Sequence, residues 1–182
     1  MTIRKVLKIG DPKLANNSEK VTNYQALSSS DLIQDMLDTM EAESGAGIAA
    51  PQIGEMSRIV IFGINKNPRY PDVEPVPTTI LINPEIEILD ETLEDAWEGC
   101  LSVPGFRGLV PRYKSIRYTG YDQNGDLIDK EVSGFHARVV QHEVDHLDGI
   151  LYPQRIKDLT NFGLIEELEA AGRIPKISKD SE

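Results

Sequence analysis

The chain has 182 residues, of which 40% are hydrophobic, and this is enough to bury the core of one ordinary domain. Its 19 lysines and arginines against 30 aspartates and glutamates give a net charge of −11, which disfavours binding to nucleic acid or to an anionic membrane surface. A single cysteine excludes an intrachain disulfide and any zinc module with several cysteines, and there are only three histidines. Any metal site must therefore use nearly all of these residues.

The N-terminus carries no recognisable targeting signal. Its first ten residues, MTIRKVLKIG, are too short and too charged to hold the apolar stretch of a signal peptide. The longest apolar run, Ile59 to Ile64, is far shorter than the ~20 residues that span a bilayer. A free thiol without an export signal predicts a cytoplasmic protein.

The first predicted element is a helix that begins near Asp31 and ends before Gly45. Its apolar residues recur at spacings of three and four and so share one helical face: Leu32, Ile33, Met36, Leu37 and Met40. Strands are predicted at 58–63 and 79–82, and the segment 65–77 between them, with four prolines, is expected to be an exposed loop. Apolar and acidic residues alternate around Ile86 and Ile88, which predicts a further strand.

In the second half of the chain, strands at 115–121 and 127–133 flank an Asn-Gly step, which is a strong hairpin signal. Helices are predicted at 137–147 and, with an amphipathic pattern closed by Gly172, at 158–171. Strands followed by two late helices predict an α+β fold. We expect one domain over residues 1–172 and a mobile tail over residues 173–182.

The strongest motif lies in the predicted helix at 137–147, where the residues from His142 to His146 match the H-E-x-x-H pattern. Residues four apart in a helix share a face, so both imidazoles can bind one metal ion while Glu143 acts as a general base. The alternative is a solvated helix face with two ordinary histidines. It is less consistent with two of only three histidines falling in register.

A catalytic metal site with two histidines needs a third protein ligand and an open position. Tyr152 stands where the extended metzincin motif requires a histidine, so that motif fails. Glu166 or Glu167 is a candidate carboxylate ligand, although a solvated acidic helix face explains both more simply. His136 does not share the helical face of His142, and we expect it to be an ordinary surface or core histidine.

The remaining candidate ligand is Cys100, in the segment EGCLS that follows seven carboxylates between residues 85 and 98. A single cysteine is most often a small buried apolar residue. Here the neighbouring Gly99 lets the backbone bend sharply, and the metal site still lacks a ligand. A thiolate is a soft, negatively charged ligand that suits Fe(II) or Zn(II) better than Mg²⁺ or Ca²⁺.

A third motif is the small-residue loop GAGIAAPQ, from Gly45 to Gln52. It lacks the Gly-Lys-Ser/Thr ending and the preceding strand of a phosphate-binding loop, so a nucleotide site is not predicted. Gly45 has a simple alternative role as the end of the preceding helix. Gly47 would let a ligand backbone approach closely, and the amide of Gln52 can donate a hydrogen bond to an oxyanion.

Taken together, the three motifs resemble those of the peptide deformylase family, which carries G-x-G-x-A-A-x-Q, E-G-C-L-S and Q-H-E-x-D-H-L-x-G in this order. The resemblance spans roughly residues 1–172. It implies antiparallel strands around a central helix that carries both histidines, with a C-terminal helix packed alongside. It also implies removal of the N-formyl group from the N-terminal formylmethionine of newly made bacterial or organellar polypeptides, with release of formate. The alternative is an H-E-x-x-H metallopeptidase.

The resemblance implies a metal site with Cys100, His142 and His146 as the ligands. The usual ion of the family is Fe(II), and Zn, Ni or Co can occupy the same site. A thiolate on iron makes such a site sensitive to oxidation.

The resemblance also implies roles for four residues around the metal. Glu143 would be the catalytic acid and base, which takes a proton from water and passes it to the departing amine. The side chain of Gln52 and the backbone N–H of Leu101 would stabilise the oxyanion, and one such donor is typically worth about 3 kcal/mol. Gly47 would contact the substrate backbone.

The implied partners are nascent N-formylmethionyl polypeptides. Some family members contact the ribosome through a basic C-terminal helix, but the predicted C-terminal helix here is acidic, which disfavours docking by that route. Two arginines, Arg107 and Arg112, follow Cys100 closely. They either bind the substrate backbone or pair with Glu98.

Overall fold

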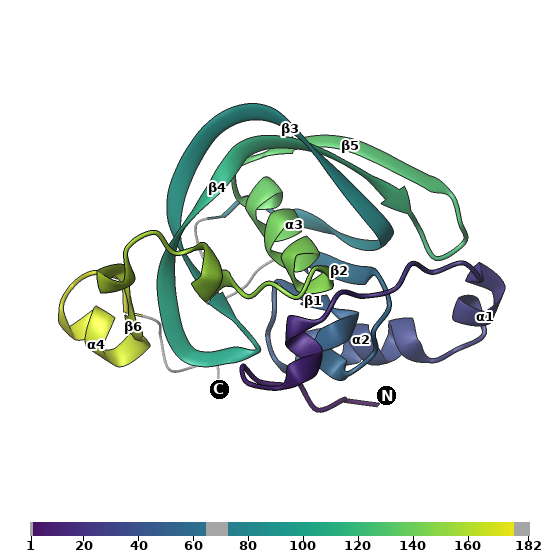
Figure 1. Ribbon diagram of the computed structural model, residues 1–182, viewed down its shortest axis with the longest axis horizontal. Helices are drawn as coiled ribbons and strands as arrows, with labels where there is room; N and C mark the ends of the chain where they lie inside the picture. The colour runs from purple at the N-terminus through teal and green to yellow at the C-terminus, as the bar shows by residue number, and fades with distance from the viewer. Residues whose placement is uncertain (1, 65–72, 177–182) are drawn as a thin grey trace.

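The computed structural model describes residues 2–64 and 73–176. Within them, six strands form one antiparallel sheet in the order β1-β2-β3-β4-β5, with β6 also paired to β4. The sheet wraps around the central helix α3, Gly134–Leu147 (Figure 1). This confirms the α+β fold predicted from the sequence. The strands are β1 (Gly47–Ala49), β2 (Ile59–Ile64), β3 (Val76–Cys100), β4 (Val103–Tyr121), β5 (Leu127–Ser133) and β6 (Phe162–Leu164).

Further helices surround this sheet in the described part of the chain. The α-helices are α1 (Tyr24–Ser28), α2 (Leu32–Ala42) and α4 (Ile165–Ala170), and short 3-10 helices lie at Pro12–Ala15, Ala50–Ile53, Tyr152–Arg155 and Leu159–Asn161. The predicted helix after Asp31 and the predicted hairpin at 115–133 are confirmed. None of the described helices has both the length and the apolar character needed to cross a bilayer.

The sequence predicted short strands where the structure has long ones. β3 joins the predicted segments 79–82 and 86–88 into one strand of 25 residues, which pairs with β4 to form an arched ribbon over α3 (Figure 1). The register of β3 against β4 shifts around Asn83, which has a φ of 52°. The Asn83 side chain holds this conformation: its Oδ1 accepts a hydrogen bond from the N–H of Val21, and its Nδ2 donates one to the carbonyl of Val21, both at 2.9 Å. The breaks in the alternating pattern are therefore bulges within a continuous strand.

The predicted helix over 158–171 is wrong for most of its length, because only Ile165–Ala170 is α-helical. Residues Phe162–Leu164 form β6 instead, antiparallel to Phe106–Gly108 of β4. The rings of Phe106 and Phe162 stack with their centroids 5.0 Å apart. Strand pairing and this ring contact outweigh the helical spacing of the apolar residues, and neither is visible in the local sequence.

Two residues that the sequence assigned to a mobile tail are packed onto the rest of the chain. Ile174 is buried, and the guanidinium of Arg173 donates a hydrogen bond of 2.7 Å to the carbonyl of Thr160. The packed part of the chain therefore extends to Ile174. Residues 177–182 of the predicted tail, and residues 65–72 of the predicted proline-rich loop, lie outside the described residues.

Helix α3 is held at the centre because its apolar side packs on the sheet. Val140 and Leu147 of α3 share one buried cluster with Phe62 of β2 and Tyr118 of β4, and none of these four side chains is exposed. Burying a side chain of this size contributes about 1.5–3 kcal/mol. A second cluster packs α2 against β1 and β2. The helix with the H-E-x-x-H motif is thus fixed against the strands.

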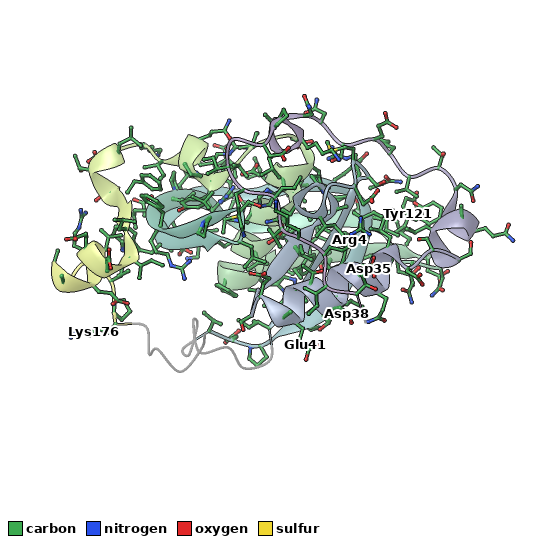
Figure 2. All side chains as sticks on the ribbon, turned by 90° about the horizontal axis from the view of Figure 1, so that it is seen from below. Arg4, Asp35, Asp38, Glu41, Tyr121 and Lys176 are labelled. Carbon is green, nitrogen blue, oxygen red and sulfur yellow. The ribbon has the colours of Figure 1, made fainter. Side chains whose placement is uncertain are left out.

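The N-terminal segment ties α2 to the strands beside this helix. Arg4 lies next to Asp35 of α2 (Figure 2), and the closest distance between its guanidinium and that carboxylate is 3.0 Å. Further along the segment, backbone N–H groups donate to the carbonyl oxygens of Gln52 (2.7 Å) and Ser102 (2.8 Å). The segment therefore links two stretches that the sequence analysis placed near a catalytic site.

Two glycines with almost the same positive φ angle allow a test of the packing around α3. Gly149, just after α3, has a φ of 70°, and a Cβ there would lie 2.7 Å from the backbone carbon of Ala15. Gly172 has a φ of 68°, and no described atom lies within 4 Å of its Cβ position. We predict that Gly172→Ala costs only the conformational strain of about 1–2 kcal/mol, and that Gly149→Ala costs roughly 1–3 kcal/mol more. Urea unfolding of both variants measures the difference, and equal losses would contradict this packing.

Candidate metal centre

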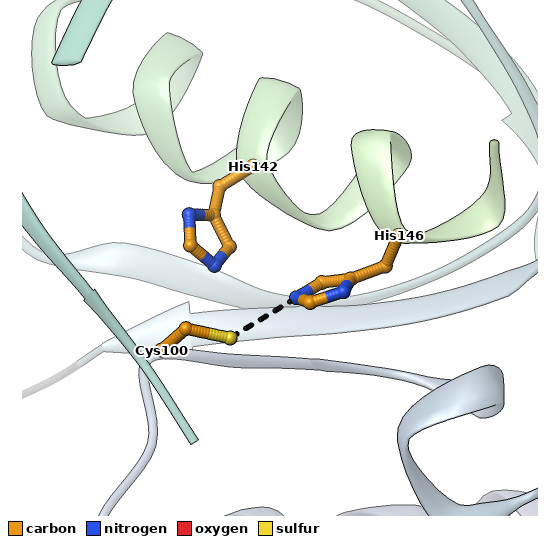
Figure 3. A group of neighbouring side chains, drawn as sticks. All are labelled: Cys100, His142 and His146. Carbon is orange, nitrogen blue, oxygen red and sulfur yellow. Dashed lines mark hydrogen bonds between the residues drawn. The ribbon is translucent and has the colours of Figure 1, made fainter. Parts of the chain in front are cut away.

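The end of β3 and one face of α3 bring three candidate metal ligands together (Figure 3). The Sγ of Cys100 lies 3.3 Å from the Nε2 of His146, and the ligand atoms of Cys100, His142 and His146 all lie within 4.8 Å of one another. Cys100 is the last residue of β3, and the two histidines are one helical turn apart, as the H-E-x-x-H spacing predicts. The structure thus assembles the three residues that the sequence analysis named as ligands.

The spacing and chemistry of this cluster fit a metal ion. Zinc bonds of about 2.3 Å to sulfur and 2.0–2.1 Å to nitrogen, at tetrahedral angles, would place the two ligand atoms about 3.5 Å apart. The observed separation between Cys100 and His146 is 3.3 Å. One thiolate with two imidazoles is a donor set that suits zinc or iron rather than magnesium or calcium.

The charges around Cys100 favour its metal-binding form. Burial alone would raise the pKa of the thiol, but the imidazoles of His146 and His142 favour the thiolate, and the pKa lies well below its usual value. The backbone N–H of Ser102 also donates to the sulfur at 3.4 Å. Because the thiolate is the form that binds metals, Cys100 is prepared to act as a ligand.

Glu98 is a site residue whose contact with a histidine the sequence analysis missed. Its Oε2 accepts a hydrogen bond of 2.8 Å from the Nδ1 of His142, which leaves the other ring nitrogen facing Cys100 (Figure 3). Burial opposes ionisation of Glu98, but His142 and Arg112 outweigh it and hold the pKa well below its usual range. Metal-binding histidines commonly donate their second N–H to a carboxylate, so a partner was to be expected. The sequence could not indicate which of seven neighbouring carboxylates it is.

Arg112 of β4 connects Glu98 to a second carboxylate on α3. Its Nε and Nη2 each donate to Glu98 at 3.0 Å, and its Nη1 donates to Asp145 at 2.5 Å. Asp145 also accepts hydrogen bonds of 3.1 and 2.7 Å from Arg155. Of the two roles that the sequence left open for Arg112, pairing with Glu98 is confirmed.

Arg107 lines the cavity beside the site. Its guanidinium packs closely on Gly99, and a Cβ at position 99 would overlap with it.

Glu143 differs from Glu98 in that its carboxyl group has little to stabilise its charge. It is 5% exposed, and its Oε2 has no hydrogen-bond partner among the described residues. Burial raises its pKa to about 7, although the charges of His142 and His146 oppose this shift. Gly47 of β1 packs against the carboxyl group, and a Cβ at this position would overlap it. Position 47 therefore requires glycine because the carboxyl group of Glu143 lies so close to its backbone.

Gln52 and Leu101 flank the cysteine. The Oε1 of Gln52 accepts a backbone N–H of β1 at 2.8 Å, and its Nε2 donates to the Oγ of Ser102 at 3.0 Å and lies 3.6 Å from the Sγ of Cys100. These bonds fix the orientation of the amide. Leu101 lies in the turn between β3 and β4, where its carbonyl accepts a hydrogen bond of 2.8 Å from Lys8. No local sequence signal pointed to Lys8.

These groups line a cavity of about 640 Å³, within the usual range for ligand sites. Six of the seven residues predicted for the site line this cavity: Gly47, Gln52, Cys100, Leu101, His142 and Glu143. The seventh, His146, lies behind the cavity wall, with 1% of its surface exposed. The cavity therefore gives a ligand direct access to the cluster.

The other candidate ligands lie apart from the cluster in the described structure. Glu166 lines the cavity, but neither it nor Glu167 belongs to the group of ligand atoms around Cys100. His136 packs beside Tyr118, 3.4 Å from its hydroxyl. It is thus a half-buried histidine of the core edge, as expected.

The buried position of Arg112 makes a stability prediction. Arg112→Met would leave the carboxylates of Glu98 and Asp145 without their shared cation, and breaking a buried pair in this way costs about 3–5 kcal/mol. The matched control is Arg117→Met, which removes an exposed arginine of the same strand from its pair with Asp129. We expect chemical unfolding to show a large loss for Arg112→Met and almost none for Arg117→Met. Similar losses would contradict the assigned network.

Comparison with known proteins shows the family of the chain. The family model described as polypeptide deformylase matches residues 3–162. Peptide deformylase 2 of Ralstonia nicotianae is 58% identical over 166 residues, which cover 91% of this chain and 94% of the relative.

Similar solved structures belong to the same family. A class I type b peptide deformylase from Acinetobacter baumannii has a TM-score of 0.81 at 38% identity, over 86% of this chain and 100% of that one. The same type of enzyme from that organism, bound to Met-Ala-Ser, has a TM-score of 0.78 at 36% identity, over 85% of this chain and 99% of that one. The chain therefore belongs to the polypeptide deformylase family, and it is a hydrolase that removes the N-formyl group from nascent polypeptides.

Proposed function

We propose that this chain performs deformylation with a metal ion held by Cys100, His142 and His146. The observation that carries the proposal is the convergence of these three ligand atoms within 4.8 Å, beside the buried carboxyl group of Glu143, at the wall of an open cavity. The family is metal-dependent. We propose Fe(II) as the ion, and the same donor set also suits Zn, Ni or Co.

The proposed chemistry divides between the metal and Glu143. A metal ion in this site would supply Lewis-acid activation of water and of the formyl group. Glu143 takes up the proton that water loses when it attacks the formyl carbon, and then delivers it to the amine nitrogen as the C–N bond breaks. A pKa near 7 suits a group that must both accept and release a proton at neutral pH. The products are formate and a free N-terminus.

Two donors would stabilise the charge that develops on the formyl oxygen. These are the Nε2 of Gln52 and the backbone N–H of Leu101. The amide of Gln52 is already oriented by its bond to Ser102, so little reorganisation is needed at the moment of reaction. Gly47 would contact the substrate through its backbone, since β1 forms part of the cavity wall.

The proposed substrates are peptides with an N-terminal formylmethionine. Support comes from the Acinetobacter baumannii peptide deformylase that was solved with Met-Ala-Ser bound, because this peptide begins with methionine. We propose a cytoplasmic location on the basis of the single free thiol, and one catalytic domain over residues 1–172, onto which Arg173 and Ile174 also pack. The net charge of −11 supports neither a nucleic-acid nor a membrane partner. The short, acidic α4 gives no support to ribosome docking through that helix.

Release of formate tests the proposed reaction. Anaerobically prepared, iron-loaded protein is expected to release formate from formyl-Met-Ala-Ser. We predict that Glu143→Gln lowers kcat by about 10²- to 10⁴-fold, because the variant keeps the shape of the side chain but cannot carry the proton. Glu94→Gln, on the exposed part of β3, is the control and should leave the rate unchanged. No release by the wild type, or an undiminished rate for Glu143→Gln, would refute the proposal.

Metal retention distinguishes the proposed site from an H-E-x-x-H metallopeptidase with a carboxylate ligand. After dialysis against a chelator, we expect Cys100→Ala to lose its metal because one of three ligands is gone. Glu166→Ala should retain it, because Glu166 lies outside the ligand cluster. Elemental analysis gives the metal content directly. The opposite pattern would favour the metallopeptidase site.

A further inference from the structure

The C-terminal segment Phe162–Ile174 forms one wall of the cavity, although it supplies none of the groups proposed for the reaction. Leu164 of β6 and Ile165, Glu166 and Glu169 of α4 all line the cavity. β6 and α4 lie at the left edge of the molecule in Figure 1. The lower end of the β3–β4 ribbon lies between them and α2. This wall therefore comes from a part of the fold separate from the metal centre.

The first half of the segment is attached to the strand that leaves the metal centre. β6 is antiparallel to Phe106–Gly108 of β4, and the rings of Phe106 and Phe162 stack at 5.0 Å. Leu168 of α4 is buried, and it lies over Gly163 of β6. The wall thus has a defined position relative to β4.

Arg173 attaches the end of the segment to β3. Its guanidinium lies over the ring of Trp97, 5.5 Å from the centroid, where a cation is attracted by the aromatic face. The same guanidinium donates to the carbonyl of Thr160 at 2.7 Å and to the side chain of Asn161. Trp97 itself lines the cavity, three residues before Cys100. Arg173 therefore connects the wall with the strand that ends in a candidate metal ligand.

The size of the cavity suggests which part of a substrate meets this wall. The formyl carbon must lie beside Cys100 and Glu143, so the first residue occupies the part of the cavity next to α3. An extended peptide advances about 3.3 Å per residue, and 640 Å³ is the size of a site for a ligand larger than one amino acid. The second and later residues would then pass the other lining residues, which include Leu164 and Ile165.

We propose that the segment Phe162–Ile174 is a binding wall for the second and later residues of the formylated peptide. Arg173 acts as a positioning residue that holds this wall against Trp97. The inference rests on the proposed function, since it requires a peptide whose formyl group reaches Glu143. It predicts that longer formyl peptides bind more tightly than the shortest one.

Steady-state kinetics with two substrates, formyl-Met-Ala and formyl-Met-Ala-Ser-Ala, test this proposal on the iron-loaded enzyme. We expect Arg173→Ala to raise KM for the tetrapeptide by about three- to fivefold, with kcat and the dipeptide KM changed less than about twofold. Leu164→Ala, a change at a partly exposed side chain that does not endanger folding, should act in the same direction. Arg117→Ala, on the exposed side of β4, is the matched control.

Fluorescence gives a second readout that does not depend on catalysis. Trp97 is the only tryptophan in the chain, so the emission has a single source, which lies in the cavity lining and in contact with Arg173. We expect Arg173→Ala to shift the emission, and Met-Ala-Ser to shift it in the wild type at lower peptide concentration than in the variant. Equal KM changes for both substrates, or none, would overturn the proposed wall. A wild type that is inactive on both substrates would instead overturn the proposed function.

Discussion

The arrangement of the site depends on the hydrogen bonds and ion pairs of one buried carboxylate, that of Glu98. It lies on β3 and bonds to Arg112 on β4 and to both Arg138 and His142 on α3. Removing one member of a buried ion pair costs several kcal/mol, whereas an exposed pair contributes little, so this contact holds two strands and the helix in one arrangement. Cys100 follows Glu98 by two residues. The position of its sulfur opposite the two imidazoles is a consequence of the same contact.

Two glutamates of this site have different environments and therefore different chemistry. Glu98 is surrounded by guanidinium groups and stays ionised, so it orients His142 permanently. Glu143, next to His142 in the chain, is buried without a hydrogen-bond partner for its Oε2 among the described residues, and its pKa rises to about 7. One carboxylate thus serves structure, and the other is left available for proton transfer. The glycine at 47 preserves this difference, because a side chain there would displace the carboxyl group of Glu143.

The part of the site that the residues predicted without the family resemblance depends on local geometry. The spacing of His142 and His146 placed both on one helical face because the helical period is a local property. The scarcity of other ligands made Cys100 a candidate, and the resemblance to the deformylase family named it as the third ligand. Three features could not be predicted in this way: the choice of Glu98, among seven carboxylates, as the partner of His142, the continuous β3, and the strand β6 in place of a helix. Each depends on pairing between segments distant in sequence, such as Phe106 with Phe162.

X-ray absorption spectroscopy of the zinc-loaded protein can decide whether Cys100 binds the metal, because it measures the ligands of the bound ion. The arrangement of Glu98, Cys100 and the two histidines predicts one sulfur at about 2.3 Å and two imidazole nitrogens at about 2.0–2.1 Å from the zinc. A set of zinc ligands that contains only oxygen and nitrogen would show that Cys100 is not a ligand, and the proposed metal site would then be wrong.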